Sequence, residues 1–167
     1  MQQEAVKEHS PVNIKAHISA VLPEHLPVVW DDIKFLIHRA CKRSNGRHTM
    51  ETVYEQIIKQ QQQLWIIISE DTEKIIACAT TQIMSYPTGL NMLEVVLLGG
   101  SQKEDWVAEG WEILEKFARA NNCSGLQAVG RKGLRYLTVK VNKGWEEKAY
   151  LFEKKFKSLE SSAKLTA

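Results

Sequence analysis

The chain has few cysteines, no long apolar run and no extended block of charge of one sign. Its three cysteines are an odd number without Cys-x-x-Cys spacing, which argues against a disulfide framework and predicts free thiols. The longest apolar runs, 64–68 and 95–98, are too short to cross a bilayer, and residues 1–7 lack the apolar core of a secretory signal. We therefore expect a cytoplasmic protein without a membrane partner.

The chain has no large excess of positive or negative charge, which helps to decide what kind of partner it binds. Its 22 basic residues are spread among 20 acidic ones, for a formal net charge of +2. A nearly neutral, mixed surface does not favour a nucleic-acid partner. Hydrophobic residues make up 44% of the 167, so the composition is that of a folded protein, and this length favours one hydrophobic core.

The first half of the chain predicts two helices followed by three antiparallel strands. Apolar residues in 27–40 follow the spacing of one helical face, and a second helix begins at Thr49 as N-cap and runs to the glutamines at 60–63. The expected strands are 64–69, 74–85 and 91–98. Each is short and apolar and is separated from the next by polar or glycine-containing turns.

The second half predicts a long helix, a strand and a shorter helix. Their expected ranges are 104–121, 125–130 and 132–142, with the strand in the centre of the sheet. Residues 145–156 are expected to form one or two closing strands, with Tyr150, Phe152 and Phe156 alternating inward. The expected domain covers residues 25–156, between an irregular arm over 1–24 and a tail over 157–167.

This order of elements resembles the GNAT acyltransferase fold over roughly residues 27–156. Two local features support the resemblance: the strand that ends at Gly99-Gly100 before the longest helix, and the pair Gly144-Trp145, which is similar to the Gly-Phe that commonly follows the last helix of that family. The resemblance implies a single α/β domain whose mixed, mostly antiparallel sheet is flanked by helices.

The segment 106–143 also resembles GNAT-like proteins that tailed bacteriophages encode among their virion genes. The similar features are Trp-x4-Trp, Phe117-Ala-Arg, Asn122-Cys-Ser-Gly, Gly130-Arg131 and a later Lys-Gly. This resemblance implies a phage-encoded protein with a protein partner, either a virion protein or a second copy of itself.

The coenzyme A loop of the family is missing from this sequence. A working GNAT enzyme has Arg or Gln, two residues, Gly, one residue, and Gly or Ala before the long helix, where backbone N–H groups approach a diphosphate. The residues that could still favour a phosphate here are Gly99, Gly100, Ser101 and Lys103. Glu104 and Asp105 place carboxylates at the same helix end and would repel an anion. We expect no cofactor, with acetyl-coenzyme A as the ligand if the protein is active.

The catalytic residues implied by the resemblance are also displaced. The general acid of the family is often a Tyr four residues before the Gly-aromatic pair, where this chain has Lys140. Tyr136 lies one helical turn earlier and could substitute only in a shifted helix. Glu94, between the apolar Leu93 and Val95, is the candidate base toward an amine, and a solvent-facing carboxylate is the alternative.

Two further groups of residues are candidates for binding. His38, Cys41 and His48 lack a fourth ligand, so we expect no metal site. The basic cluster of Arg131, Lys132 and Arg135 is suited to a phosphate or an acidic protein surface, with solvated surface as the alternative.

The tryptophans of the long helix predict an exposed aromatic side chain. Trp106 and Trp111 are five positions apart and cannot share one helical face. An exposed Trp111 rimmed by glutamates is therefore a candidate anchor for a protein partner, and packing against the N-terminal arm is the alternative.

These observations favour a non-catalytic GNAT-fold interaction protein, encoded by a phage and used as a minor virion, connector or assembly component. The alternative is an acyl-coenzyme A-dependent N-acetyltransferase with an unconventional diphosphate loop. A third hypothesis is a small regulatory factor whose cluster around Arg131 meets an acidic partner.

Overall fold

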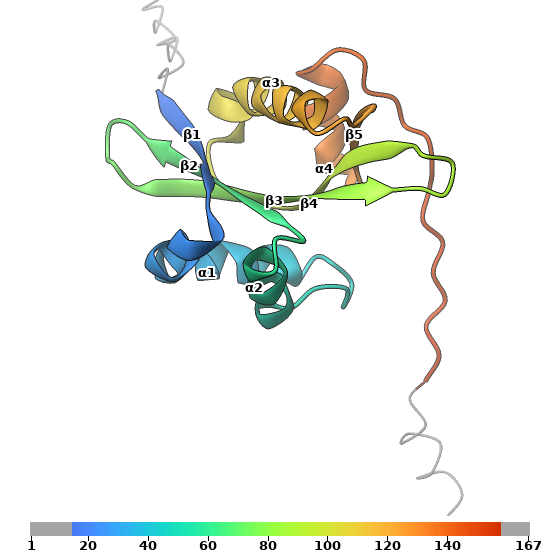
Figure 1. Cartoon of the computed structure of the whole chain (residues 1–167), viewed down its shortest axis with the longest axis horizontal. Coiled ribbons are helices and arrows are strands. Elements are labelled where there is room, and N and C mark those ends of the chain that lie inside the picture. Colours follow the sequence, from blue (N-terminus) through green and yellow to red (C-terminus); the bar gives the residue numbers. More distant parts are fainter. Residues whose placement is uncertain (1–14, 158–167) are drawn as a thin grey trace, which may run out of the picture.

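A five-stranded sheet forms the middle layer of the protein, whose computed structural model describes residues 15–157. The strand order is β1-β2-β3-β4-β5, antiparallel from β1 to β4 and parallel between β4 and β5. Helices α1 and α2 cover one face and α3 covers the other (Figure 1). The predicted α/β class, with a single domain and a mixed, mostly antiparallel sheet, is confirmed.

The elements follow the predicted order through the middle of the chain. The strands are β1 (Ala16–Val21), β2 (Gln63–Ser69), β3 (Ile75–Ser85), β4 (Asn91–Gly100) and β5 (Gly125–Ala128). The helices are η1 (Pro23–His25), α1 (Leu26–Cys41), α2 (Met50–Ile58), α3 (Lys103–Ala120), α4 (Lys132–Arg135) and the π-helical η2 (Tyr136–Lys140). Within residues 15–157, no helix combines the length and the apolar character needed to span a membrane.

Strand β1 corrects the prediction for the N-terminal arm. Residues 16–21 pair antiparallel with β2, from Ala16 opposite Ser69 to Val21 opposite Leu64. Their sequence, Ala-His-Ile-Ser-Ala-Val, is too short and too weakly alternating to predict a strand, and the strand exists because β2 supplies its hydrogen-bond partners. Residues 1–14 of the predicted arm and 158–167 of the predicted tail lie outside the described residues.

The C-terminal part differs from the prediction in two ways. Strand β5 lies at the edge of the sheet and not in its centre. Residues 146–157 form neither helix nor strand, so the predicted closing strands are absent from the described part of the chain. Tyr150, Phe152 and Phe156, predicted to point inward, are 78%, 91% and 86% exposed. Apolar alternation alone does not make a strand when no neighbouring strand lies beside it.

The sheet separates two apolar cores, and the apolar run in β2 contributes to both. Trp65 and Ile67 pack toward α3, whereas Leu64 and Ile66 pack toward α1 and α2. Successive side chains of a strand point to opposite faces, so an uninterrupted apolar run fits a strand that is covered on both sides.

Helix α3 buries both of its tryptophans, and the expectation of an exposed Trp111 is wrong. Trp106 and Trp111 are only 4% and 3% exposed. Their side chains diverge by about 140° around the helix, and the helix is covered both by the sheet and by η2. The Trp106 Nε1 donates to the carbonyl oxygen of Ser101 at 3.0 Å, and the Trp111 Nε1 donates to that of Leu137 at 2.6 Å. The Trp111 ring also packs against Trp145, with 5.0 Å between ring centroids.

Replacing Trp111 by Phe is expected to lower the free energy of unfolding by about 1–3 kcal/mol, because the carbonyl of Leu137 loses its buried donor. Chemical denaturation followed by circular dichroism measures the change. Trp30→Phe is the control, since Trp30 contacts Tyr54 edge-on and donates no hydrogen bond within residues 15–157. Equal stability of the two variants would contradict a structural role for the Trp111 donor.

Candidate functional site

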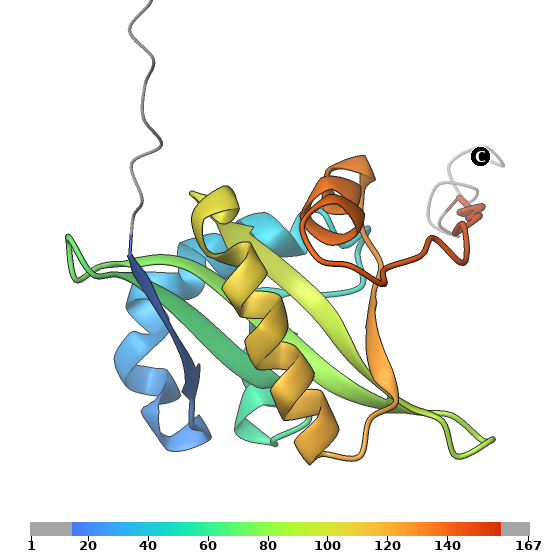
Figure 2. The ribbon, with the colours of Figure 1, turned by 90° about the horizontal axis from the view of Figure 1, so that it is seen from above.

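Strand β4 carries the candidate site because one side of its second half has no strand partner in the described structure. Strand β5 pairs only with Met92 to Val95, while β3 follows β4 to Gly100. The register shifts where Thr80 lies opposite Leu97 and Thr81 opposite Val95, so Val96 is an extra residue that bends the strand. Figure 2 shows β4 and β5 separating toward α4. The β4 backbone between residues 96 and 100 is therefore open on the β5 side.

The two glycines at the end of β4 are required by packing. A Cβ at Gly99 would lie 2.9 Å from the carbonyl oxygen of Leu36 in α1. A Cβ at Gly100 would lie within 2.4 Å of Ala77 in β3, and Gly100 has φ +130°, which side chains rarely adopt. Gly99 thus allows α1 to approach β4 closely, and Gly100 allows the close pairing with β3, so by themselves the glycines do not indicate a ligand.

A basic cleft of about 110 Å³ lies beside these glycines. It is lined by Leu36, Arg39, Ala40, Arg43, Gly99, Gly100 and Lys103. Arg39 lies in the last turn of α1, Arg43 lies in the turn that follows this helix, and Lys103 is the first residue of α3. Burial lowers the pKa of the Lys103 ammonium, and the positive charges of Arg43 and Arg131 lower it further. Crowded positive charge of this kind is relieved when an anion binds.

The carboxylates at the start of α3 do not occupy its backbone donors. Glu104 and Asp105 are exposed, and within residues 15–157 neither accepts a hydrogen bond from the N–H groups of the first turn. Gln102, the N-cap residue at φ +56°, also makes no side-chain capping bond. The negative charge of Glu104 raises the pKa of Lys103 and so offsets part of the effect of the neighbouring positive charges. The carboxylates thus reduce the positive potential at this helix end without blocking it.

A polar cluster around Glu94 lies further back along β4. Its half-buried carboxylate accepts hydrogen bonds from the Gln82 Nε2 at 2.6 Å and from the Gln127 Nε2 at 3.4 Å. The Tyr86 hydroxyl lies 2.9 Å from the same Gln127 nitrogen. Burial lowers the pKa of His48, and the negative charge of Glu94 offsets part of that effect. Three strands thus hold one carboxylate beside the α1–α2 loop.

The structure brings some of the residues predicted from the sequence together and separates others. The positive charge of Arg131 lowers the pKa of Lys103, although Arg131 is not among the residues that line the cleft. Arg135 instead pairs with Glu147 at 3.4 Å, and Lys132 is exposed. Tyr136 begins η2 and is 53% exposed, and its role as a general acid stays a prediction. The described residues contain no group of three or more potential metal ligands.

Four polar residues of the site were missed in the sequence. The sequence does contain a signal for Arg39 and Arg43, because their spacing of four positions would place two basic residues on one helical face. Nothing local marks Gln82 or Gln127, since only the pairing of three strands brings their amides to Glu94.

No family model matches the chain, and no curated protein matches its sequence. Its structure, however, resembles those of solved acetyltransferases. A ribosomal-protein-alanine N-acetyltransferase from Brucella melitensis biovar Abortus 2308 matches with a TM-score of 0.61 at 11% identity, over 84% of this chain and 100% of that one. The fold is that of the GNAT acetyltransferases.

Two further matches have the same GNAT fold. An aminoglycoside acetyltransferase from an uncultured soil metagenomic sample, solved with sisomicin, has a TM-score of 0.62 at 13% identity, covering 85% of this chain and 97% of that one. A predicted acetyltransferase from Clostridium acetobutylicum, solved with acetyl-coenzyme A, has a TM-score of 0.60 at 14% identity, covering 84% and 96%.

These matches contradict the function that the sequence favoured. A non-catalytic, phage-encoded interaction protein was expected, whereas the three structures named above are described as acetyltransferases. Nothing in them supports a role in a phage virion or connector. The findings favour the alternative, an acyl-coenzyme A-dependent transferase.

Gly100→Ala is expected to lower the free energy of unfolding by about 1–3 kcal/mol, because alanine is strained at φ +130° and its Cβ would collide with Ala77. Gly133→Ala is the matched control, since it adds the same methyl group in α4 with nothing within 4 Å. Thermal and chemical denaturation of both variants test this requirement. Similar stability of the two variants would show that β4 does not need glycine at this position.

Proposed function

We propose that this protein is an N-acyltransferase that moves an acyl group from a coenzyme A thioester, such as acetyl-coenzyme A, to an amine. The basic cleft beside the open side of β4 carries the proposal. It gathers Arg39, Arg43 and Lys103, with Arg131 close enough to act on Lys103. An anionic group bound there lies at the end of a strand that can pair with an extended ligand. The fold supports the proposal, because one matching structure holds acetyl-coenzyme A.

Side chains take the place of the missing glycine-rich loop in this proposal. The diphosphate of coenzyme A needs positive charge and hydrogen-bond donors, and arginine offers both in a planar fork. Arg39 approaches from the end of α1 and Arg43 from the turn after it, and Lys103 approaches from the N-terminus of α3, where the helix dipole also favours an anion. The residues of the cleft therefore fit a diphosphate although the usual sequence signature is absent.

The open part of β4 suits the linear arm of the same ligand. Backbone N–H and C=O groups between residues 96 and 100 lack a strand partner on the β5 side. An extended chain with amide groups can hydrogen-bond to such an edge as an added strand would. Bound coenzyme A thioester supplies an activated acyl group, and β4 would direct it from the basic cleft toward Glu94.

Glu94 is the residue assigned to proton transfer. Its carboxylate can accept a proton from the acceptor amine, and the amides of Gln82 and Gln127 hold it in one orientation. The lowered pKa of His48 favours the uncharged imidazole, which does not repel a cationic amine that enters beside the α1–α2 loop.

Calorimetric titration with acetyl-coenzyme A tests the binding site. The protein should bind saturably, and Arg43→Gln or Lys103→Gln should weaken binding by about 10-fold or more, because each removes a charged donor from the cleft. Lys59→Gln is the control, since this lysine lies at the end of α2 and pairs only weakly with Glu55 at 3.8 Å. Absence of binding to the unmodified protein would refute the proposed function.

Turnover tests the role of Glu94. The release of free coenzyme A is followed with a thiol reagent over a panel of amines. Glu94→Gln should lower kcat by about 10²- to 10⁴-fold. Binding of acetyl-coenzyme A should change little, because Glu94 lies outside the basic cleft. Glu109→Gln, at an exposed position of α3, is the control. Unchanged turnover in Glu94→Gln would show that Glu94 is not the base, and it would not contradict the proposed binding site.

A further inference from the structure

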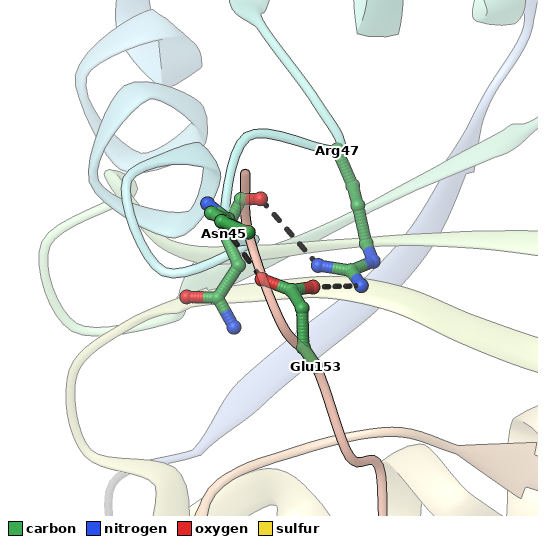
Figure 3. Close-up of polar contacts among 4 residues, drawn as sticks. Asn45, Arg47 and Glu153 are labelled. Atoms are coloured by element: carbon green, nitrogen blue, oxygen red, sulfur yellow. Dashed lines mark hydrogen bonds and ion pairs between the residues drawn. The ribbon is translucent and has the colours of Figure 1, made fainter. Parts of the chain in front are cut away.

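One ion pair ties the outer half of the segment 146–157 to the α1–α2 loop. Figure 1 shows this segment leaving the layer of α3 and α4 and running past the sheet. Its Glu153 carboxylate then pairs with the Arg47 Nη2 at 2.5 Å (Figure 3). The two side chains are 31% and 45% exposed. Ion pairs at such positions are weak, so another carboxylate can take the place of Glu153.

The contact with Glu153 uses only part of what the Arg47 side chain offers. A guanidinium has five N–H donors in a planar fork, which matches both oxygens of one carboxylate. Within residues 15–157, only the Glu153 Oε2 accepts a hydrogen bond from this fork, and the Oε1 lies 3.7 Å from the Lys155 Nζ. The Arg47 Nη1 donates to the Asn45 carbonyl at 3.4 Å, which helps to orient the guanidinium. Arg47 is therefore a carboxylate site that its own chain fills incompletely.

Arg47 also lies beside the residue assigned to proton transfer. Leu93 and Val95 belong to the core under α3, so the Glu94 side chain between them points to the face that α1 and α2 cover. The α1–α2 loop is on that face, and His48 follows Arg47 directly in it. Burial lowers the pKa of His48, and the negative charge of Glu94 raises it, so the loop and the carboxylate are neighbours.

We propose that the acceptor is a small amine that also carries a carboxylate, such as a free amino acid, and that Arg47 binds this carboxylate in place of Glu153. An ammonium group is attracted to Glu94 and a carboxylate to Arg47, so a ligand with both charges fits the site. A ligand with positive charges only would be repelled by Arg47. This inference rests on the proposed transferase function, because it names the acceptor of that reaction.

The transfer balances with this acceptor. Glu94 takes one proton from the ammonium group, and the nitrogen then attacks the thioester carbon. A C–N bond forms, the C–S bond breaks, and the second proton lost by the nitrogen goes to the departing thiolate. The product keeps its carboxylate but has lost the positive charge that Glu94 attracts. Return of Glu153 to Arg47 therefore favours release of the product.

Turnover of matched acceptors tests the inference. Glycine, β-alanine and 4-aminobutanoate are each compared with the corresponding amide, which lacks the negative charge. At least one acid should have a kcat/KM about 10-fold or more above that of its amide, and Arg47→Gln should remove the difference. Arg119→Gln, at an exposed position at the end of α3, is the matched control and should keep it. Amines that are acylated without preference for an acid would overturn the inference and not the transferase function.

Glu153→Gln tests whether the carboxylate of the chain competes with that of the acceptor. The KM for the preferred acid should fall by about 2- to 5-fold with kcat unchanged, because an exposed ion pair is weak. Glu146→Gln is the matched control, since Glu146 lies on the same segment and pairs with Lys148 instead. An unchanged or higher KM in Glu153→Gln would contradict the proposed replacement of Glu153 at Arg47.

Binding without turnover separates this inference from the proposed function. The Nε–Hε resonance of Arg47 in isotope-labelled protein is identified by its loss in Arg47→Gln. In the presence of free coenzyme A, which carries no acyl group, an added acid should shift this resonance, and its amide at equal ionic strength should not. A resonance that none of the acids shifts overturns the inference even if the protein transfers acyl groups. A shift in a protein that does not bind acetyl-coenzyme A would support the carboxylate site and refute the transferase.

Discussion

The close approach of α1 to the end of β4 is the constraint on which the candidate site depends. The Leu36 carbonyl leaves no room for a side chain at residue 99, and Ala77 leaves none at residue 100. Because the two elements meet there, Arg39 in the next turn of α1 and Arg43 just after the helix line the same cleft as the first residue of α3. The basic cleft is a consequence of this packing: a larger residue at Gly99 would force α1 and β4 apart, and one at Gly100 would force β3 and β4 apart.

The course of β4 relates the basic cleft to Glu94. The strand pairs with β5 over its first half, where Glu94 is held by two amides, and has an open side over its second half. The extra residue at Val96 separates these halves and changes which side chains face α1. A ligand bound at the glycines can therefore extend along β4 toward the carboxylate.

Electrostatics at the start of α3 explains why the sequence favoured the wrong function. Glu104 and Asp105 were expected to satisfy the helix donors and exclude a second anion. In the structure they are exposed, Arg39 and Arg43 line the cleft with Lys103, and the positive charge of Arg131 also lowers the pKa of Lys103. The sequence of this one segment does not show Arg39 and Arg43, which only the fold brings to the cleft.

The sequence by itself determined both long helices, strands β2 to β4 and, through the order of its elements, the GNAT fold. These features rest on local periodicity and turn residues, which act over a few neighbouring positions. It also singled out Glu94, Lys103 and Arg131 one by one. Only the tertiary structure decided that Lys103 shares a cleft with Arg39 and Arg43, that Trp111 is buried, that residues 16–21 form a strand and that 146–157 form none. Each of these depends on what lies beside a residue in space, and no local pattern contains that information.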